Sequence, residues 1–127
     1  RVITVEIPAG MDAPDAGVSF ALINPEFVRM VGEKEEGTEG CLSVPGWAGK
    51  VPRRPQVVVK GLGTDGKSVR RKARGYLARV LQHEIDHTHG VLFIDQATEV
   101  WPVEEGEEEA AEMEDAGRRS GAERLRE

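Results

Sequence analysis

Two histidines and a glutamate lie together in the segment His83-Glu84-Ile85-Asp86-His87. If this segment is helical, His83 and His87 project from the same face one turn apart, so both imidazoles can reach one metal ion. Glu84 then lies beside His83, where a carboxylate can act on a water molecule bound to that metal. The same pattern also arises by chance on helices whose polar face only meets solvent. A catalytic site needs a third protein ligand, so that ligand decides between the two interpretations.

Candidates for the third ligand lie both before and after the histidine segment. A metzincin protease would have a ligand at position 93, but the side chain of Phe93 cannot coordinate a metal. Other zincins use a glutamate on a later helix, and acids at a suitable separation are Glu104, Glu105 and Glu107. These acids lie in a glutamate-rich segment with little apolar surface to fix them. Cys41 is the better candidate, because a thiolate adds a negative charge and a soft ligand to the two imidazoles.

The elements that position these residues are predicted from apolar spacing and turn residues. A helix is predicted over residues 76–88, because Leu77, Leu81 and Ile85 form one apolar stripe and a glycine follows the helix end. Strands are predicted over residues 1–7, 18–23, 56–62 and 67–73, and a short strand or extended segment over 91–94. Asn24-Pro25 is expected to end the second strand, and Asp65-Gly66 to form a type I′ turn. Residues 32–40 are polar and expected to be exposed. This order predicts an α+β fold in which small antiparallel sheets pack around one central helix.

The length and charge of the chain indicate one small domain followed by an acidic tail. The chain has 127 residues, and its net charge of −6 belongs to residues 101–127, which hold ten acids and four bases. Residues 1–100 hold thirteen acids and thirteen bases, and this neutral body predicts no direct DNA binding. We expect a catalytic domain over residues 1–100 and a helical or disordered tail over 101–127. The single cysteine excludes an intramolecular disulfide, and no apolar run or leader indicates a membrane span or secretion.

Two separate motifs carry a resemblance to a known family. The segment Glu39-Gly40-Cys41-Leu42-Ser43, with Pro45, Val51 and Arg53, resembles the second motif of peptide deformylases. The segment Gln82-His83-Glu84-Ile85-Asp86-His87 resembles their third motif. The order and separation of the motifs also fit, and the resemblance covers roughly residues 1–97. Two independent motifs rarely coincide by accident.

The resemblance implies a cytoplasmic metallohydrolase that removes the N-formyl group from the N-terminal methionine of nascent proteins and releases formate. It implies Cys41, His83 and His87 as ligands of one divalent ion, Fe(II) in the cell with Zn(II) as the alternative. Glu84 would be the general base, and the backbone N–H of Leu42 would stabilise the oxyanion. The implied partners are N-formylmethionyl nascent peptides and, as a second partner, the ribosome.

The family resemblance also suggests supporting residues around this site. A methionine pocket is expected at Tyr76, Arg79 and Val80, which precede His83 on the metal-facing side of the helix, with ordinary core packing as the alternative. Arg53 is expected to pair with Glu39 or Asp86 and hold the second-motif loop against the helix.

One family motif has no counterpart in this sequence. Peptide deformylases carry Gly-x-Gly-Leu-Ala-Ala-Pro-Gln before the second motif, and Gly61-Leu62-Gly63 is followed by Thr64-Asp65 instead. We expect that the motif precedes Arg1 in a longer protein and that this chain by itself is weakly active or inactive. The alternatives are a non-catalytic metal-binding relative and a zincin-like metalloprotease.

Overall fold

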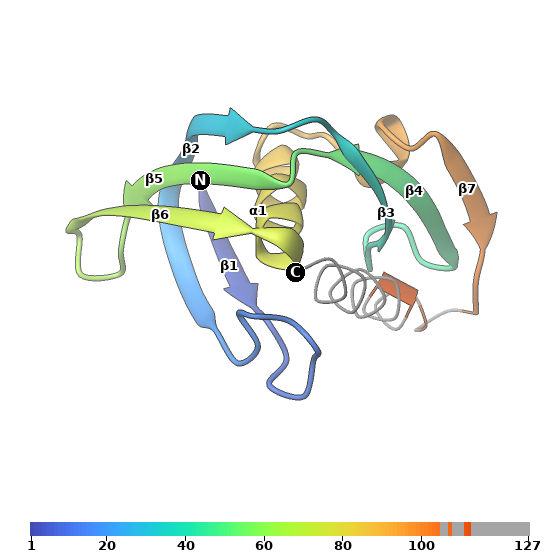
Figure 1. Cartoon of the computed structure of the whole chain (residues 1–127), viewed down its shortest axis with the longest axis horizontal. Helices are drawn as coiled ribbons and strands as arrows, with labels where there is room; N and C mark the ends of the chain where they lie inside the picture. The colour runs from blue at the N-terminus through green and yellow to red at the C-terminus, as the bar shows by residue number, and fades with distance from the viewer. Residues whose placement is uncertain (105–106, 108–110, 113–127) are drawn as a thin grey trace.

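The computed structural model describes residues 1–104, 107 and 111–112, and folds them into two antiparallel sheets on either side of one helix (Figure 1). In chain order the elements are β1 (Val2–Glu6), β2 (Ser19–Val31), β3 (Glu35–Gly40), β4 (Trp47–Arg53), β5 (Gln56–Leu62), β6 (Ser68–Arg74), α1 (Gly75–Thr88), the 3₁₀ turn η1 (Phe93–Asp95) and β7 (Glu99–Pro102). The predicted α+β class, with small antiparallel sheets around one central helix, is confirmed. No helix among the described residues is long and apolar enough to cross a membrane.

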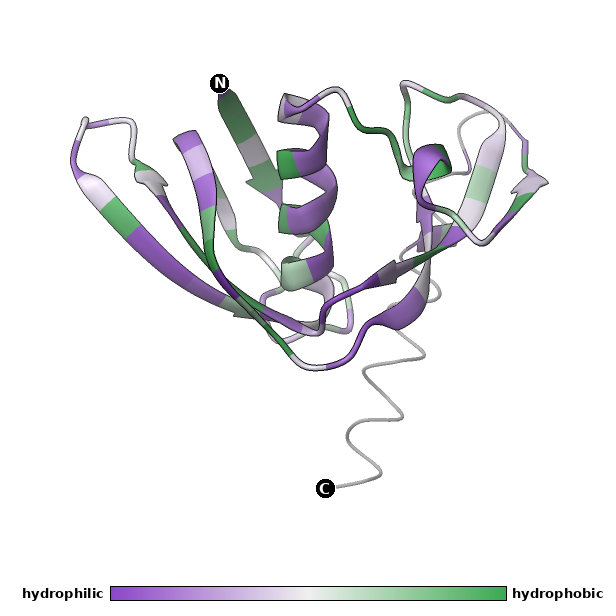
Figure 2. Ribbon diagram, turned by 90° about the horizontal axis from the view of Figure 1, so that it is seen from above, coloured by the Kyte–Doolittle hydropathy of each residue, from purple (hydrophilic) through white to green (hydrophobic). Residues whose placement is uncertain are grey.

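The hydrophobic core lies between α1 and a four-stranded sheet of order β1-β2-β5-β6. The predicted stripe of Leu77, Leu81 and Ile85 is at most 3% exposed and packs against Ile3, Val5 and the other core residues of the sheet. The sheet curves around the helix, and in Figure 2 hydrophobic green residues lie on the side of the α1 ribbon that faces the sheet. Because one whole face of α1 is fixed in this way, the opposite face is held in a defined orientation.

The second sheet, of order β3-β4-β7, lies on the other side of α1. In this sheet β3 pairs with β4 from Glu35↔Arg53 to Gly40↔Ala48, and β4 pairs with β7 from Trp47↔Pro102 to Lys50↔Glu99. Successive side chains of a strand point to opposite faces, so Glu39 and Cys41 leave the end of β3 on the same side. This arrangement presents the second-motif residues to the polar face of α1.

The end of α1 is closed by a Schellman motif. The N–H of Val91 donates to the carbonyl of Asp86 at 3.0 Å, and the N–H of Gly90 donates to the carbonyl of His87 at 3.1 Å. Gly90 has φ +75°, the left-handed conformation that this cap requires and that glycine adopts without strain. The cap fixes the last turn of the helix, which carries His87.

Several local predictions were wrong. Asn24-Pro25 does not end β2, because the strand continues to Val31 through an irregularity where Asn24 adopts φ +50°, a setting that tolerates proline. The hairpin turn is not type I′, since only Gly66 has a positive φ there and its N–H donates to the carbonyl of Gly63. Residues 37–40 are buried in β3, not exposed. The segment predicted as extended over 91–94 contains η1 from Phe93 onward.

Candidate metal centre

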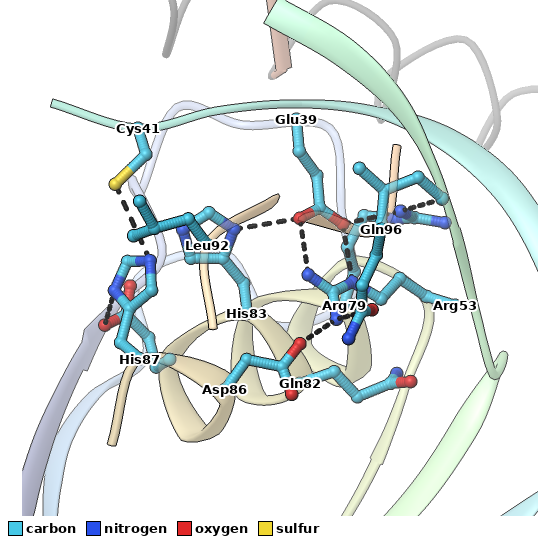
Figure 3. A network of polar contacts seen from close by, with 12 residues as sticks. Glu39, Cys41, Arg53, Arg79, Gln82, His83, Asp86, His87, Leu92 and Gln96 are labelled. Carbon is cyan, nitrogen blue, oxygen red and sulfur yellow. Dashed lines mark hydrogen bonds and ion pairs between the residues drawn. The ribbon is translucent and has the colours of Figure 1, made fainter. Parts of the chain in front are cut away.

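The side chains of Cys41, His83 and His87 come together at one point between β3 and α1. The ligand atoms of all three lie within 4.8 Å of one another, and this is the only cluster of potential metal ligands found among the described residues. His83 and His87 lie one turn apart on α1, with ring centroids 4.4 Å apart, and Cys41 follows the end of β3 (Figure 3). The predicted proximity of Cys41 to His83 and His87 is confirmed.

The three donors fit a tetrahedral metal site. The Sγ of Cys41 lies 3.7 Å from the Nε2 of His87. A zinc ion bound at about 2.3 Å to sulfur and about 2.1 Å to nitrogen, with a tetrahedral angle, would put these two atoms about 3.6 Å apart. One thiolate and two imidazoles suit Zn(II) and Fe(II), and three protein ligands leave one position for a water molecule.

His83 is oriented by a buried carboxylate. Its Nδ1 lies 2.8 Å from the Oε1 of Glu39, whose side chain is fully buried. With Glu39 ionised, Nδ1 carries the proton and donates it to the carboxylate, so the Nε2 of the same ring is left as the donor for a metal. The ring of Phe93 stacks on the ring of His83 with centroids 6.4 Å apart and an angle of 17° between planes. Phe93, whose side chain cannot serve as the third ligand of a metzincin site, therefore packs against the candidate ligand His83.

Two arginines neutralise the buried Glu39. Arg53 on β4 donates to both carboxylate oxygens, from Nε and Nη2, each at 2.9 Å. Arg79 on α1 donates from Nη1 to the Oε2 of Glu39 at 2.7 Å. Arg53 also donates to the carboxylate of Asp86, one residue before His87 (Figure 3). Ion pairs of Arg53 with both Glu39 and Asp86 are therefore present, and they join β3, β4 and α1 around the site.

The charges in this cluster shift the pKa values of its members. Burial by itself would raise the pKa of Glu39, but hydrogen bonds from Arg53 and His83 and the charges of both arginines lower it to about 2. Burial by itself would lower the pKa of His83, but Glu39 raises it to about 9 in the metal-free protein. Burial and the neighbouring His83 lower the pKa of His87. Glu39 is therefore ionised at neutral pH, and it lies behind His83.

Glu84 borders the site on the open side of α1. Its carboxylate oxygen lies 3.8 Å from the Nδ1 of His87, and its side chain is 34% exposed. Together with His87, Thr88 and the start of β1, Glu84 lines a hollow of about 260 Å³. Leu42 follows Cys41, its side chain is 81% exposed, and no acceptor within the described part of the chain takes its backbone N–H. A carboxylate and a backbone N–H without an acceptor among the described residues thus lie next to candidate metal ligands.

The residues expected to form a methionine pocket have different surroundings from one another. Tyr76 and Val80 are half-buried and pack against the hydrophobic core. The guanidinium of Arg79 is committed to Glu39 and to the carbonyls of Val51 and Glu35. We therefore assign the charged end of Arg79 to the support of Glu39, and a pocket role for these three residues stays a prediction.

Three supporting features were not predicted from the sequence. The contact between Glu39 and His83 joins residues 44 positions apart. The side-chain amide of Gln82 exchanges hydrogen bonds with the backbone of Arg54, at 3.0 and 2.9 Å, and so ties α1 to the β4–β5 link. A Cβ on Gly37 would lie 2.6 Å from the Cζ of Arg79, so glycine there gives the guanidinium its room. For Gly37 and Glu39, a signal in the sequence was the spacing of Gly37, Glu39 and Cys41 at every second residue, which places them on one face of an extended segment.

The family model for polypeptide deformylase matches residues 1–101. The chain belongs to the polypeptide deformylase family. Among curated members, the peptide deformylase of Thermomicrobium roseum is 56% identical over 97 residues, which cover 76% of this chain and 54% of that protein. The peptide deformylase of Desulforudis audaxviator is 45% identical over 105 residues, covering 72% of this chain and 68% of that protein.

Solved structures of deformylases have the same fold. The peptide deformylase of Synechococcus elongatus, in complex with actinonin, superposes with a TM-score of 0.67 at 38% identity, covering 76% of this chain and 48% of that one. A class I type b peptide deformylase of Acinetobacter baumannii, with Met-Ala-Ser bound, gives a TM-score of 0.69 at 40% identity, covering 76% and 62%. The chain thus spans about half to two thirds of the length of the deformylases named here.

Proposed function

We propose that this chain is the metal-binding part of a peptide deformylase, which hydrolyses the formyl amide at the N-terminal methionine of nascent chains and releases formate. The observation that carries the proposal is the convergence of Cys41, His83 and His87 within 4.8 Å, with Glu84 beside them. Family membership supports the same reaction class. The domain responsible would span residues 1–100, with the acidic tail from 101 onward, although β7 continues to Pro102.

Cys41, His83 and His87 would hold a divalent metal, which would supply a Lewis acid and lower the pKa of a water molecule. Glu84 would accept a proton from the attacking water as the water oxygen bonds to the formyl carbon. The carbon–nitrogen bond then breaks, and Glu84 delivers the proton to the departing amine. The backbone N–H of Leu42 would donate to the developing oxyanion. No acceptor among the described residues competes for this N–H.

The finer features of the proposal follow from the donor set and the family. Thiolate with two imidazoles suits both Zn(II) and Fe(II), and membership of the deformylase family favours Fe(II) as the ion in the cell, with Zn(II) as the alternative. Tyr76, Val80 and the methylene stem of Arg79 are proposed to contribute to the methionine pocket. The substrates would be N-formylmethionyl nascent peptides in the cytoplasm, where the ribosome is the source of substrate. A zincin-like protease is less well supported, because among the described residues no acid joins the two histidines.

The decisive experiment compares formate release from a formyl-Met-Ala-Ser peptide by the metal-loaded chain and by Glu84→Gln. We expect Glu84→Gln to keep the metal and to lose about 10²–10⁴-fold in rate, the range for general acid–base catalysis. Glu6→Gln is the matched control, since Glu6 is exposed on β1 and should change neither quantity. If the unmodified chain binds metal but releases no formate above the Glu84→Gln level, this part of the protein is not catalytic by itself.

A further inference from the structure

Phe93 is a buried aromatic residue that the main hydrophobic core does not account for. Its side chain has the largest volume among the fully buried side chains of the described residues, and it is only 1% exposed. The core cluster between α1 and the four-stranded sheet does not include it. Phe93 belongs to η1, which contacts β4 of the second sheet. Its ring therefore packs on the polar side of α1, where the candidate metal ligands lie.

The backbone around Phe93 is fixed by hydrogen bonds on both sides. The carbonyl of Phe93 accepts from the N–H groups of Gln96 and Ala97, at 3.1 and 2.9 Å. Just before Phe93, the N–H of Leu92 donates to the Oδ2 of Asp95 at 2.8 Å. The N–H of Asp95 donates back to the carbonyl of Leu92 at 3.0 Å. Because this turn is fixed and its surroundings are close-packed, the aromatic ring keeps one position relative to α1.

The ring of Phe93 restricts a motion of His83 that Glu39 leaves open. The contact of 2.8 Å between the Nδ1 of His83 and the Oε1 of Glu39 fixes one atom of the imidazole (Figure 3). The ring plane could still tilt, because the χ2 torsion of histidine is broad. The rings of Phe93 and His83 have centroids 6.4 Å apart and lie 17° from parallel, within the range of offset stacking. A tilt would break this stacking and swing Nε2 away from the point where Cys41 and His87 converge.

The two histidines have different surroundings as a result. The side chain of His83 is 8% exposed, whereas that of His87 is 25% exposed and borders the hollow beside Glu84. An apolar shell around a metal site controls the access of solvent and the local dielectric. Phe93 supplies this shell at His83. His83 is therefore the ligand that the fold orients most completely, by a carboxylate at one ring atom and an aromatic ring on one face.

We propose that Phe93 is a positioning residue of the metal centre, which acts through His83 by holding the imidazole with Nε2 directed at the metal. The inference rests on the proposed function, because it takes His83 as a metal ligand, and it adds a residue that coordinates nothing itself. A ligand that is already oriented loses less conformational freedom on binding, so the stacking raises the affinity for the metal. A phenylalanine that only filled space would stabilise the fold and leave the affinity unchanged.

The test is a zinc competition assay on the complete chain and on two variants, Phe93→Leu and Phe93→Met. Both replacements are apolar and fill much of the same space, but neither has a flat ring face. We expect each variant to bind zinc about 10–100-fold more weakly, the range found when a residue that orients a metal ligand is replaced. The assay is run without denaturant on protein that circular dichroism shows to be folded, so that lower stability by itself does not change the affinity.

Cobalt gives a second readout that a space-filling role would not move. The visible absorption spectrum of the cobalt-loaded chain depends on the geometry of the donor atoms, and we expect both Phe93 variants to change it. A variant that folds only in the presence of metal is judged by this spectrum.

Phe27→Leu is the matched control, since Phe27 packs against the main core and not against a ligand. It should lower the stability of the chain but keep the zinc affinity and the cobalt spectrum of the unmodified chain. The proposal is overturned if the Phe93 variants bind zinc as tightly as the unmodified chain with the same cobalt spectrum, or if Phe27→Leu loses as much zinc affinity as they do. Absence of formate release from the unmodified chain, together with weaker zinc binding by the Phe93 variants, would count against the proposed function and not against the role of Phe93.

Discussion

The Nδ1 of His83 lies 2.8 Å from the Oε1 of Glu39, and this contact links the two halves of the metal centre. Glu39 precedes Cys41 by two residues at the end of β3, so one strand end supplies a ligand and also supports a ligand on the helix. A carboxylate behind a metal-binding imidazole fixes its tautomer and orientation.

Glu39→Gln should weaken zinc binding and destabilise the metal-free protein. The amide cannot balance Arg53 and Arg79, and breaking a buried ion pair by removing one partner costs about 3–5 kcal/mol. Loss of the carboxylate behind His83 should weaken zinc affinity by about 10–100-fold. Chemical denaturation and a zinc competition assay measure the two effects. Glu33→Gln is the control, since Glu33 is exposed on a loop. Unchanged zinc affinity in a folded Glu39→Gln protein would argue against the supporting role.

Arg79→Lys should lower stability although it keeps the charge. An ammonium group cannot reach Glu39 together with the carbonyls of Val51 and Glu35, as the guanidinium does. Loss of these hydrogen bonds should reduce the free energy of unfolding by about 1–3 kcal/mol. Zinc affinity should change much less than in Glu39→Gln, because Arg53 still holds Glu39 through two hydrogen bonds. Arg70→Lys on the exposed sheet face is the control. A fall in zinc affinity as large as that of Glu39→Gln would show that Arg79 positions the carboxylate directly.

Gly37→Ala should destabilise the protein through a clash with Arg79. The added Cβ would lie 2.6 Å from the guanidinium carbon, and overpacking of a tight site typically costs about 1–3 kcal/mol. Gly10→Ala should cost little, because no atom lies within 4 Å of the corresponding Cβ. In the double variant with Arg79→Lys the two losses should not add, since the thinner lysine relieves the clash. Strictly additive losses would place the cause elsewhere on β3.

Gly90→Ala should loosen the end of α1. Alanine at φ +75° is strained, and the cap holds the turn that carries His87. We expect a loss of about 1 kcal/mol in the free energy of unfolding. Hydrogen exchange should show faster exchange at the amides of Gly90 and Val91. Exchange there at the rate of the unmodified chain would mean that the cap survives without glycine.

The sequence predicted the ligand-bearing helix well because its signals are local. The spacing of Leu77, Leu81 and Ile85 and the glycine after the helix end placed α1 to within one residue of its observed bounds. The two motifs predicted that Cys41 lies near His83 and His87 and that Arg53 pairs with Glu39 or Asp86, and the structure has these contacts.

The strands of the second sheet, β3, β4 and β7, were not predicted from the sequence, because each depends on partners far along the chain. The segment Glu35–Gly40 is polar and contains two glycines, yet its end is buried, because Arg53 and Arg79 neutralise Glu39 from other elements. The four residues of β7 gain their conformation only by pairing with β4. The continuation of β2 beyond Asn24-Pro25 likewise depends on pairing with β5, which overrides the local signal for a strand end.

The central claim is that Cys41, His83 and His87 bind one metal ion, and X-ray absorption spectroscopy of the zinc-loaded chain tests it most directly. We expect one sulfur at about 2.3 Å and two imidazole nitrogens at about 2.0–2.1 Å, with a fourth light ligand from water. Cys41→Ala should remove the sulfur signal and most of the bound zinc. A full complement of zinc with only nitrogen and oxygen neighbours in the unmodified chain would contradict the account.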